Sequence, residues 1–332
     1  MAGIICGTGA YVPEYTMDND DIAKLVETSD AWIRERTGVT RRHIVRDETT
    51  VSMACEAGRR ALENAGTSPE EVDLLLVATI SSNVILPGTA CQVQKELGAV
   101  NATCFDVGGA ACTGFVLAYN TAEAYLESGM YHTALIIGSE TLSCLTNWKD
   151  RGTCILFGDG AGAALVRRGE GQTYFPVTHT DGAKGGALTC RSRYEANGLT
   201  REMDPKIMLD EEHFMQMDGQ AVFKFAVKRV PEVIREVLER NGLEEKEVDY
   251  YIVHQANRRI VEAVAKRLGE PIEKFPMNLQ EYGNTSSASI PILLDELNRE
   301  GRLQKGQRLV LAGFGAGLTW GANIIDWRQT DV

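Results

Sequence analysis

Residues 62–78 read LENAGTSPEEVDLLLVA, and residues 238–254 read LERNGLEEKEVDYYIVH. In both stretches Leu-Glu is followed by a glycine, by Glu-Val-Asp and then by an apolar run typical of a buried strand. The second copy follows the first by 176 residues, and residues 134–138 recur as residues 309–313 at a spacing of 175. Ordered matches at a nearly constant spacing indicate an internal duplication.

Strand-like apolar runs alternate with amphipathic helical patterns in the first half of the chain. The expected helices cover residues 52–65, 89–97 and 113–128, and the expected strands cover residues 72–78, 102–107 and 134–138. This rhythm predicts an α/β fold with largely parallel strand pairing. Together with the duplication, it predicts two similar α/β halves, residues 1–172 and 173–332.

Two segments are apolar nearly all round, as expected of helices buried between two layers. The first is the expected helix 113–128. Its counterpart begins around Ser289, with Pro291 acceptable in the first turn. Each helix starts just after one of the polar or reactive residues considered below.

The composition is that of an ordinary globular protein, with 332 residues, 44% hydrophobic and 24% charged, and a formal net charge of −12. This acidic balance argues against general nucleic-acid binding and against attraction to an anionic membrane. The longest apolar stretches fall far short of the roughly 20 residues that span a bilayer. An acidic partner would therefore need a local basic patch.

Two further features predict a cytoplasmic protein. The N-terminus lacks the basic and long apolar regions of a signal peptide and is expected to form the first strand. The eight cysteines show no Cys-x-x-Cys spacing, which indicates reduced thiols and no zinc site.

Cys112 is the candidate nucleophile. It follows the expected strand 102–107 and a bend at residues 108–111, and it precedes the first buried helix. A thiol at a helix N-terminus is favoured as the thiolate, and a strand-to-helix turn is a typical site for an exposed nucleophile. The alternative for any cysteine is a small, unreactive buried residue.

His254 and Asn284 are the candidate partners of this thiol. His254 ends the apolar run 250–253, and catalytic groups in α/β folds gather at the carboxyl ends of strands, although a histidine satisfied at a buried strand end is the alternative. Asn284 lies in the polar loop 282–289, where a helix cap is the alternative. Because Cys112 and Asn284 sit in loops that lead into the duplicated helices, pseudo-symmetry predicts that they meet.

Two Gly-rich runs, residues 157–164 and 313–321, have neither dinucleotide-binding nor phosphate-loop spacing. The second run is expected to bring backbone close to a substrate and to donate an amide to a developing oxyanion.

In these motifs the chain resembles the β-ketoacyl-[acyl-carrier-protein] synthase III family of thiolase-like condensing enzymes. The resemblance runs nearly end to end and is carried by residues 7–9, 28–33, 36–38, 111–115, 157–163, 254–257, 283–286 and 315–321. It implies a thiolase-like fold, in which two duplicated α/β halves pack as a layered αβαβα sandwich.

The resemblance implies a decarboxylative Claisen condensation that initiates fatty acid biosynthesis. Cys112 would take an acyl group from an acyl-coenzyme A primer, with the backbone amides of Cys112 and Ala316 holding the oxyanion. Malonyl acyl carrier protein would then lose carbon dioxide, with His254 and Asn284 stabilising the enolate, to give a 3-oxoacyl carrier protein. No metal or redox cofactor is expected.

Roles in substrate binding are implied in the same way. Coenzyme A is expected at Trp32, Arg36, Thr37, Arg151 and Gln220. The acidic acyl carrier protein is expected to dock on a basic patch that includes Lys224, Arg259, Lys266 and Arg267.

The family pattern also implies a homodimer whose partner chain completes the acyl pocket. The residue expected there is Leu86, where acetyl-specific members often have Phe, and the smaller side chain favours a longer or branched primer. In addition, this chain has one residue more between Asp106 and Cys112 than family members usually show, with Gly108-Gly109 as added flexibility that could reshape the pocket.

Two other functions stay open. One is a related condensing or acyl-transfer enzyme of secondary metabolism that uses another acceptor. The other is a non-catalytic subunit that binds acyl-coenzyme A or a carrier protein on the same fold. The intact set of Cys112, His254 and Asn284 argues against the second, because a binding subunit needs no nucleophile.

Overall fold

The computed structural model describes residues 1–192 and 211–327. Its first half contains strands β1 (Ala2–Tyr11), β2 (Thr16–Asp18), β3 (Arg41–His43), β4 (Leu74–Ala78), β5 (Thr103–Val107), β6 (Thr133–Glu140) and β7 (Gly160–Gly169), and helices α1 (Asn19–Ala23), α2 (Asp30–Thr37), α3 (Thr50–Asn64), α4 (Thr89–Leu97), α5 (Gly114–Ser128) and α6 (Arg151–Cys154). Its second half contains strands β8 (Val177–Thr180), β9 (Leu188–Thr189), β10 (Gln216–Met217), β11 (Tyr250–Val253), β12 (Arg308–Gly315) and β13 (Thr319–Asp326), and helices α7 (Gly219–Arg240), α8 (Arg258–Leu268), α9 (Leu279–Tyr282) and α10 (Ser289–Arg299).

Two sheets with matching strand order form the framework. The first has the order β1-β7-β6-β4-β5, and the second has the order β8-β13-β12-β11. The repeated sequences at residues 62–78 and 238–254 lead into β4 and β11, which occupy equivalent places. The predicted α/β fold of two duplicated halves is therefore confirmed. The division at residues 172 and 173 stays a prediction, and it falls in the connection between β7 and β8.

The expectation of largely parallel pairing is wrong. β4 pairs in parallel with β5 and β6, and β11 pairs in parallel with β12, but the other pairs in the two large sheets are antiparallel. The reason is visible at the β12–β13 connection, where residues 316–318 form a short turn. A short turn returns the chain antiparallel, whereas a parallel neighbour needs a long crossover.

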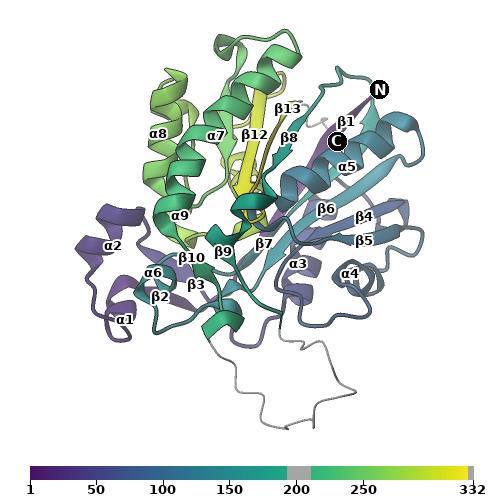
Figure 1. Ribbon diagram of the computed structural model, residues 1–332. Coiled ribbons are helices and arrows are strands. Elements are labelled where there is room, and N and C mark those ends of the chain that lie inside the picture. Colours follow the sequence, from purple (N-terminus) through teal and green to yellow (C-terminus); the bar gives the residue numbers. More distant parts are fainter. Residues whose placement is uncertain (193–210, 328–332) are drawn as a thin grey trace.

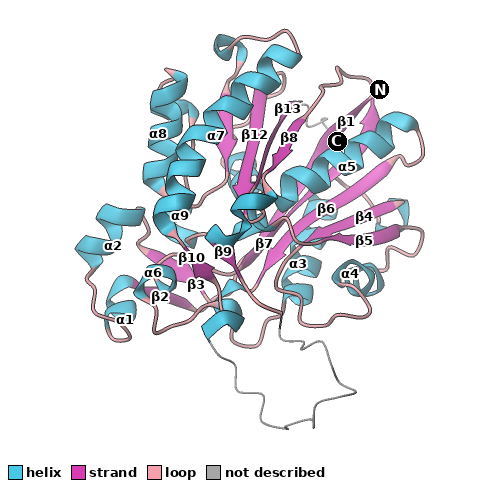
Figure 2. Cartoon of the chain, in the orientation of Figure 1, coloured by secondary structure: helices cyan, strands magenta, loops and turns pink. Residues whose placement is uncertain are grey.

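Five layers of helix and sheet are stacked on one another (Figure 1 and Figure 2). α3 and α4 cover the outer face of the first sheet, α5 and α10 lie between the sheets, and α7 and α8 cover the outer face of the second. Alternate strand residues serve different layers, since Leu74 and Leu76 pack on the central helices while Leu75 and Val77 pack under α3 and α4. Each central helix thus begins inside the molecule, between the two halves.

A left-handed residue precedes each central helix. Ala111 has a φ of 44° in the turn η2 (Ala111–Thr113), and Ser286 has a φ of 49° in the turn η8 (Ser286–Ala288). Few non-glycine residues adopt this conformation. η2 and η8 pack against each other, so that the loops before α5 and α10 meet at the junction of the halves.

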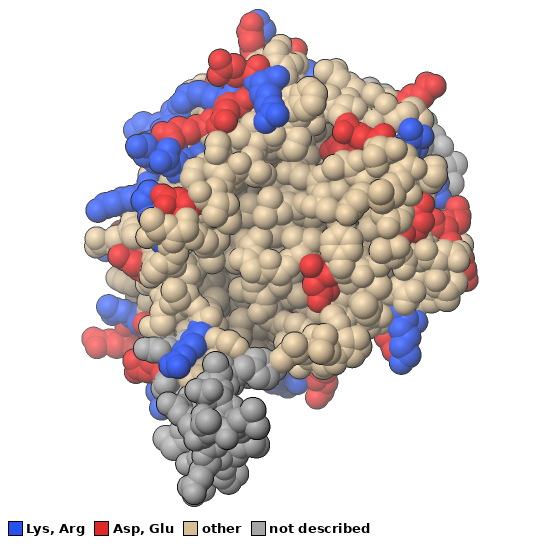
Figure 3. All heavy atoms as spheres, turned by 45° about the vertical axis from the view of Figure 1, so that its right-hand side comes forward, with Lys and Arg blue, Asp and Glu red and all other residues tan. Residues whose placement is uncertain are grey.

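One side of the molecule carries few charges. Figure 3 brings forward the side that bears β4, β5 and α4 in Figure 1, and a broad uncharged area covers much of this face. The loop between β4 and α4 exposes Val84, Ile85 and Leu86. Within residues 1–192 and 211–327, no helix combines the length and the hydrophobicity that a transmembrane span requires.

A buried carboxyl group in α5 makes stability depend on pH. Glu123 is 7% exposed and accepts a hydrogen bond of 3.3 Å from Asn323 in β13. Burial raises its pKa from 4.5 to about 7, so the folded state holds the proton more tightly than the unfolded state does. This contribution is fully present below about pH 4.5 and is lost as the pH rises to about 7.

We expect Glu123→Gln to remove this dependence. Relative to the wild type, the variant should gain about 3 kcal/mol in free energy of unfolding between pH 4.5 and pH 8, because the glutamine never ionises. Urea unfolding at both pH values measures the difference. Glu239→Gln, at an exposed position of α7, is the control. The prediction would be contradicted if the free energy of unfolding changed with pH in the same way in the wild type and in Glu123→Gln.

Candidate active site

One cavity, with a volume of about 920 Å³, is lined by Cys112, His254 and Asn284 together. Cys112 lies in η2, His254 directly follows β11, and Asn284 precedes η8. All three are buried, with exposed fractions of 8%, 1% and 7%. The structure therefore brings the three candidate catalytic residues into one site, and both halves of the chain contribute to it.

The resting form of Cys112 differs from the expectation of a thiolate. Burial raises the pKa of this thiol to about 12, and the hydroxyl of Ser286 and the amide of Asn284 offset only part of the rise. The buried carboxyl of Glu140 adds to it. Cys112 precedes the first α-helical residue of α5, Gly114, and desolvation outweighs the field of the helix end there. The thiol of Cys112, the candidate nucleophile, is therefore neutral at rest.

The backbone of β12 lies against Cys112. A Cβ atom on Gly315 would be 2.9 Å from the backbone nitrogen of Cys112, a separation that only a glycine avoids. The next residue, Ala316, lines the cavity. The second Gly-rich run thus brings the backbone of Ala316 to the cavity wall that also carries Cys112.

His254 is held in one orientation by its Nδ1 atom. The ring nitrogen Nδ1 is 2.7 Å from the hydroxyl oxygen of Ser289, the first residue of α10, and the backbone N–H of Gln255 donates to the same oxygen at 3.4 Å. The ring also packs edge-on against Phe314. Because Ser289 already accepts from Gln255, its own proton is available for Nδ1, which favours the tautomer with hydrogen on Nε2.

Burial keeps the ring of His254 neutral. It lowers the pKa of His254 to about 3, so the imidazole carries no charge at neutral pH. With Nδ1 bonded to Ser289, Nε2 is the nitrogen left for a substrate. A neutral Nε2–H group is a hydrogen-bond donor that can stabilise a developing negative charge.

The side chain of Asn284 is likewise held so that it keeps a hydrogen-bond donor. Its carbonyl oxygen Oδ1 accepts a hydrogen bond of 2.9 Å from the backbone N–H of Ser286. Its backbone is fixed by hydrogen bonds to Leu156, at 2.8 Å, and from Gly158, at 3.0 Å. Since Oδ1 is engaged within the loop, the amide nitrogen Nδ2 is the part of the side chain left as a donor.

The inner part of the cavity is apolar. Leu142, Phe157 and Met215 form a buried cluster and line the cavity. Leu86 is not among the lining residues and is 83% exposed. Within a single chain the cavity is therefore lined by other side chains, and the role of Leu86 across a dimer interface stays a prediction.

The outer part of the cavity carries a tryptophan with two guanidinium groups beside it. Trp32, Arg36 and Thr37 line the cavity, and all belong to α2. The guanidinium carbon of Arg151 lies 5.0 Å from the ring centre of Trp32, and that of Arg36 lies 5.7 Å from it. This cluster offers a flat aromatic face with positive charge beside it, which suits a nucleotide with phosphates.

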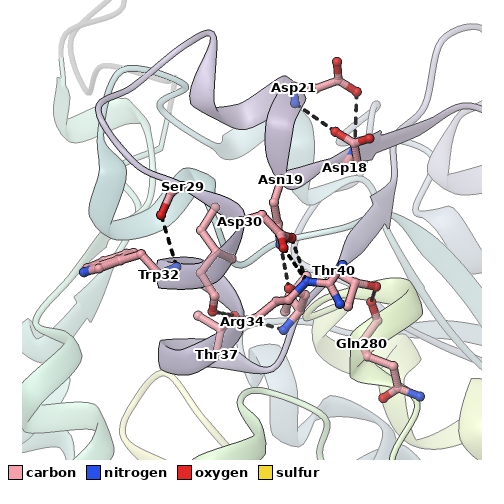
Figure 4. Close-up of polar contacts among 12 residues, drawn as sticks. Asp18, Asn19, Asp21, Ser29, Asp30, Trp32, Arg34, Thr37, Thr40 and Gln280 are labelled. Carbon is pink, nitrogen blue, oxygen red and sulfur yellow. Dashed lines mark hydrogen bonds and ion pairs between the residues drawn. The ribbon is translucent and has the colours of Figure 1, made fainter.

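The helix that carries Trp32 is anchored on the side away from that ring (Figure 4). Ser29 caps α2 through the backbone N–H of Trp32, and the amide of Asn19 donates to Asp30 at 2.9 Å. In Figure 4 the ring of Trp32 extends away from these contacts. The hydroxyl of Thr37 is engaged at the end of the same helix, where it donates to Ile33, so Thr37 supports α2 more than it offers a free donor.

The remaining predicted substrate residues lie around the opening or on α8. Gln220, Lys224 and Arg259 line the cavity and are exposed. Lys266 and Arg267 are exposed in the last turn of α8 and do not line the cavity. A protein that docks on all four cations would therefore cover α8 as well as the opening.

Carbon–carbon bond formation on a thioester needs a nucleophile that holds an acyl group and donors that hold an enolate. This cavity contains a thiol and two oriented polar side chains that are suited to these tasks, within a duplicated α/β sandwich. Fold and cavity together place the chain among the thiolase-like condensing enzymes, which are acyltransferases. Residues 105–182 match the 3-oxoacyl-[acyl-carrier-protein (ACP)] synthase III family, and residues 238–327 match the C-terminal part of that family. The chain belongs to the β-ketoacyl-[acyl-carrier-protein] synthase III family.

Individual relatives support this assignment over the full length. A β-ketoacyl-[acyl-carrier-protein] synthase III from Desulfitobacterium hafniense is 48% identical, with 99% of this chain and 98% of the relative covered. The crystal structure of 3-oxoacyl-[acyl-carrier-protein] synthase III from Aquifex aeolicus has a TM-score of 0.90 and 40% identity, with 98% and 100% covered. The priming β-ketosynthase of the R1128 polyketide pathway has a TM-score of 0.89 and 34% identity, with 98% and 96% covered.

Sequence reasoning missed the two serines that contact the site from η8 and α10. Ser289 orients His254 from 35 residues away, and Ser286 lines the cavity next to Asn284. The internal duplication could have indicated Ser286. This residue lies 175 residues after Ala111 and is its counterpart in the second half. No pattern in the sequence relates Ser289 to His254.

Proposed function

We propose that this chain condenses an acyl-coenzyme A primer with malonyl acyl carrier protein, and that Cys112, His254 and Asn284 carry the reaction. The observation that carries the proposal is the cavity in which a buried thiol meets two oriented donors, Nε2–H of His254 and the amide of Asn284. The family membership of the chain gives the reaction type and its place at the start of fatty acid biosynthesis.

The first half of the proposed reaction is acyl transfer. The sulfur of Cys112 attacks the thioester carbonyl of acyl-coenzyme A, and the backbone amides of Cys112 and Ala316 hold the oxyanion. The carbon–sulfur bond to coenzyme A then breaks, and its thiolate takes the proton that Cys112 released. Because the resting thiol is neutral, its proton leaves the sulfur of Cys112 at the attack and reaches the sulfur of coenzyme A when the carbon–sulfur bond breaks.

The second half is decarboxylative condensation. Breaking the bond to the malonyl carboxylate releases carbon dioxide and leaves a thioester enolate, whose oxygen accepts hydrogen bonds from His254 and Asn284. The enolate carbon attacks the acyl carbonyl on Cys112, and the sulfur leaves as a thiolate that is then protonated. No metal or redox cofactor takes part in this proposal, since loss of carbon dioxide supplies the electron pair and neutral donors hold the charge.

The proposed ligands fit the two ends of the cavity. The Trp32 cluster at the outer end suits the nucleotide of coenzyme A, with Arg36 and Arg151 near its phosphates. Lys224 and Arg259 at the opening, with Lys266 and Arg267 on α8, supply positive charge for an acidic carrier protein on a chain of net charge −12.

A homodimer and a cytoplasmic location complete the proposal. The broad uncharged face with the exposed loop of Val84, Ile85 and Leu86 is the surface we assign to the second copy, and it would place Leu86 at the partner's acyl pocket. All eight cysteines lie in the described part of the chain and none forms a disulfide, which agrees with a reducing compartment.

Replacement of Ser289 tests whether His254 acts as an Nε2–H donor in the condensation step. Ser289→Ala should lower the rate of condensation about tenfold to hundredfold, because the ring loses the partner that keeps hydrogen on Nε2. Acyl transfer to Cys112 should change much less, since the enolate forms only in the second half. Single-turnover loading and steady-state condensation measure the two steps. An equal fall in both rates would show that Ser289 supports the site only structurally.

Intact-mass analysis tests the proposed function directly. We expect the wild type to gain one acyl group from acetyl-, isobutyryl- or longer acyl-coenzyme A, and peptide mapping should place that group on Cys112. Malonyl acyl carrier protein should then discharge it and yield a 3-oxoacyl product. The thioester that loads fastest identifies the primer class. Absence of an adduct with every thioester would favour the binding-subunit alternative, and discharge only by another acceptor would favour secondary metabolism.

A further inference from the structure

The cavity contains a buried hydroxyl group without a hydrogen-bond partner. Ser286 is 1% exposed, and its Oγ atom makes no hydrogen bond of regular geometry. The residue lines the same cavity as Cys112 and Asn284. An unsatisfied buried hydroxyl is destabilising. We therefore expect the hydroxyl of Ser286 to gain a hydrogen-bond partner during the reaction.

The backbone around this hydroxyl is strained and firmly held. Ser286 has a φ of 49°, and its N–H donates to Asn284 at 2.9 Å. The adjacent Ser287 fixes the turn, since its hydroxyl lies 2.9 Å from the carbonyl oxygen of Ala78 and 2.8 Å from Glu140. Ser287 therefore serves the turn, whereas the hydroxyl of Ser286 makes no hydrogen bond of regular geometry and lies close enough to Cys112 and Glu140 to lower the pKa of both. Strain of this kind clusters at functional sites.

Two groups near the hydroxyl of Ser286 can accept a hydrogen bond, the sulfur of Cys112 and the carboxyl of Glu140, and of these two the sulfur takes part in the proposed reaction. η8 packs against η2, and the hydroxyl of Ser286 lowers the pKa of the Cys112 thiol. The other donors have different tasks, since His254 and Asn284 are assigned to the enolate oxygen. In the resting thiol the sulfur is a weak acceptor, which agrees with the unpaired state of the hydroxyl.

We propose that Ser286 is a further catalytic residue, whose hydroxyl donates a hydrogen bond to the sulfur of Cys112 when that sulfur becomes a thiolate. The negative charge arises twice in the proposed reaction, at the attack on acyl-coenzyme A and when the sulfur leaves the condensed product. In both steps the hydroxyl gains a strong acceptor that it lacks at rest. The inference rests on the proposed role of Cys112 as the nucleophile.

The pH profile of Cys112 alkylation tests this role without any substrate. Wild type and Ser286→Ala are treated with iodoacetamide across a pH series, and peptide mapping follows the modification of Cys112 alone. Alanine keeps the Cβ atom, so the backbone strain at φ 49° is unchanged and only the hydroxyl is lost. Alkylation of Cys112 should slow about tenfold to hundredfold in Ser286→Ala at every pH between about 7 and about 10, the effect of losing one hydrogen bond to a charged group.

Ser139→Ala is the matched control, because it removes a hydroxyl of similar burial that does not line the cavity. We expect it to leave the alkylation rate of Cys112 at the wild-type value. An unchanged rate in Ser286→Ala, or an equal fall in both variants, would overturn the proposal. Failure of the wild type to accept an acyl group would instead argue against the proposed function, whatever the alkylation profile shows.

Discussion

Cys112→Ala should abolish acyl-enzyme formation and lower condensation by at least about 10⁴-fold, the scale expected when a covalent nucleophile is removed. Intact-mass analysis after acyl-coenzyme A treatment should show the adduct on the wild type and none on the variant. Cys190 also lines the cavity, so Cys190→Ala is the matched control, and it should still load one acyl group. An adduct that persists in Cys112→Ala would refute the nucleophile assignment.

The same variant should separate the two halves of the reaction. His254 is oriented by Ser289, and Asn284 is oriented by the backbone of Ser286, so neither donor depends on the sulfur. Cys112→Ala should therefore still release carbon dioxide from malonyl acyl carrier protein, to give an acetyl carrier protein in place of the condensed product. Loss of both activities would mean that the substitution has disturbed the donors.

Glu140→Ala should cost about 3 to 5 kcal/mol in free energy of unfolding, which is the largest effect on stability that we expect. Glu140 is fully buried at the end of β6, and its carboxyl group accepts hydrogen bonds from the hydroxyl of Ser81 at 2.6 Å, the N–H of Ile80 at 3.1 Å and the hydroxyl of Thr79 at 3.2 Å. The hydroxyl of Ser287 lies 2.8 Å from its other oxygen. Alanine would leave these donors unpaired around a void. Urea unfolding measures the loss.

Glu140→Gln is the control for this experiment. Glutamine fills the same volume and keeps one acceptor oxygen, so its cost should be clearly smaller. Activity should fall in Glu140→Ala as well, because Ser287 holds the turn that carries Ser286 and follows Asn284. Equal and small losses of stability in both variants would show that the carboxylate does not hold this turn.

Much of the fold was predictable because local patterns determine it. Residues 89–97 form a helix with the predicted bounds, and the predicted helix 113–128 begins one residue later as α5. The duplication predicted equivalent places for β4 and β11. Pairing direction was not predictable in the same way, because it depends on how each connection returns to the sheet, and the short turn after Gly315 reverses β13.

The candidate site was predictable in its residue types and not in its electrostatics. Cys112, His254 and Asn284 are recognisable from motifs that lie next to each of them in the sequence. Their protonation depends instead on burial by both halves, which raises the pKa of the thiol and lowers that of the imidazole. The roles inferred for Ser286 and Ser289 depend on contacts that no local pattern encodes.

The meeting of the two halves at the nucleophile has a consequence for synthesis on the ribosome. Thr113, next to Cys112, shares a hydrogen bond of 2.8 Å with Thr319, which is 206 residues further along the chain. The N-terminal part of a growing chain leaves the ribosome first. Cys112 is therefore made long before the strand that covers it, and until β12 and β13 dock the burial that raises the pKa of its thiol is incomplete, so the nascent chain carries a cysteine that ionises more readily than the folded enzyme does.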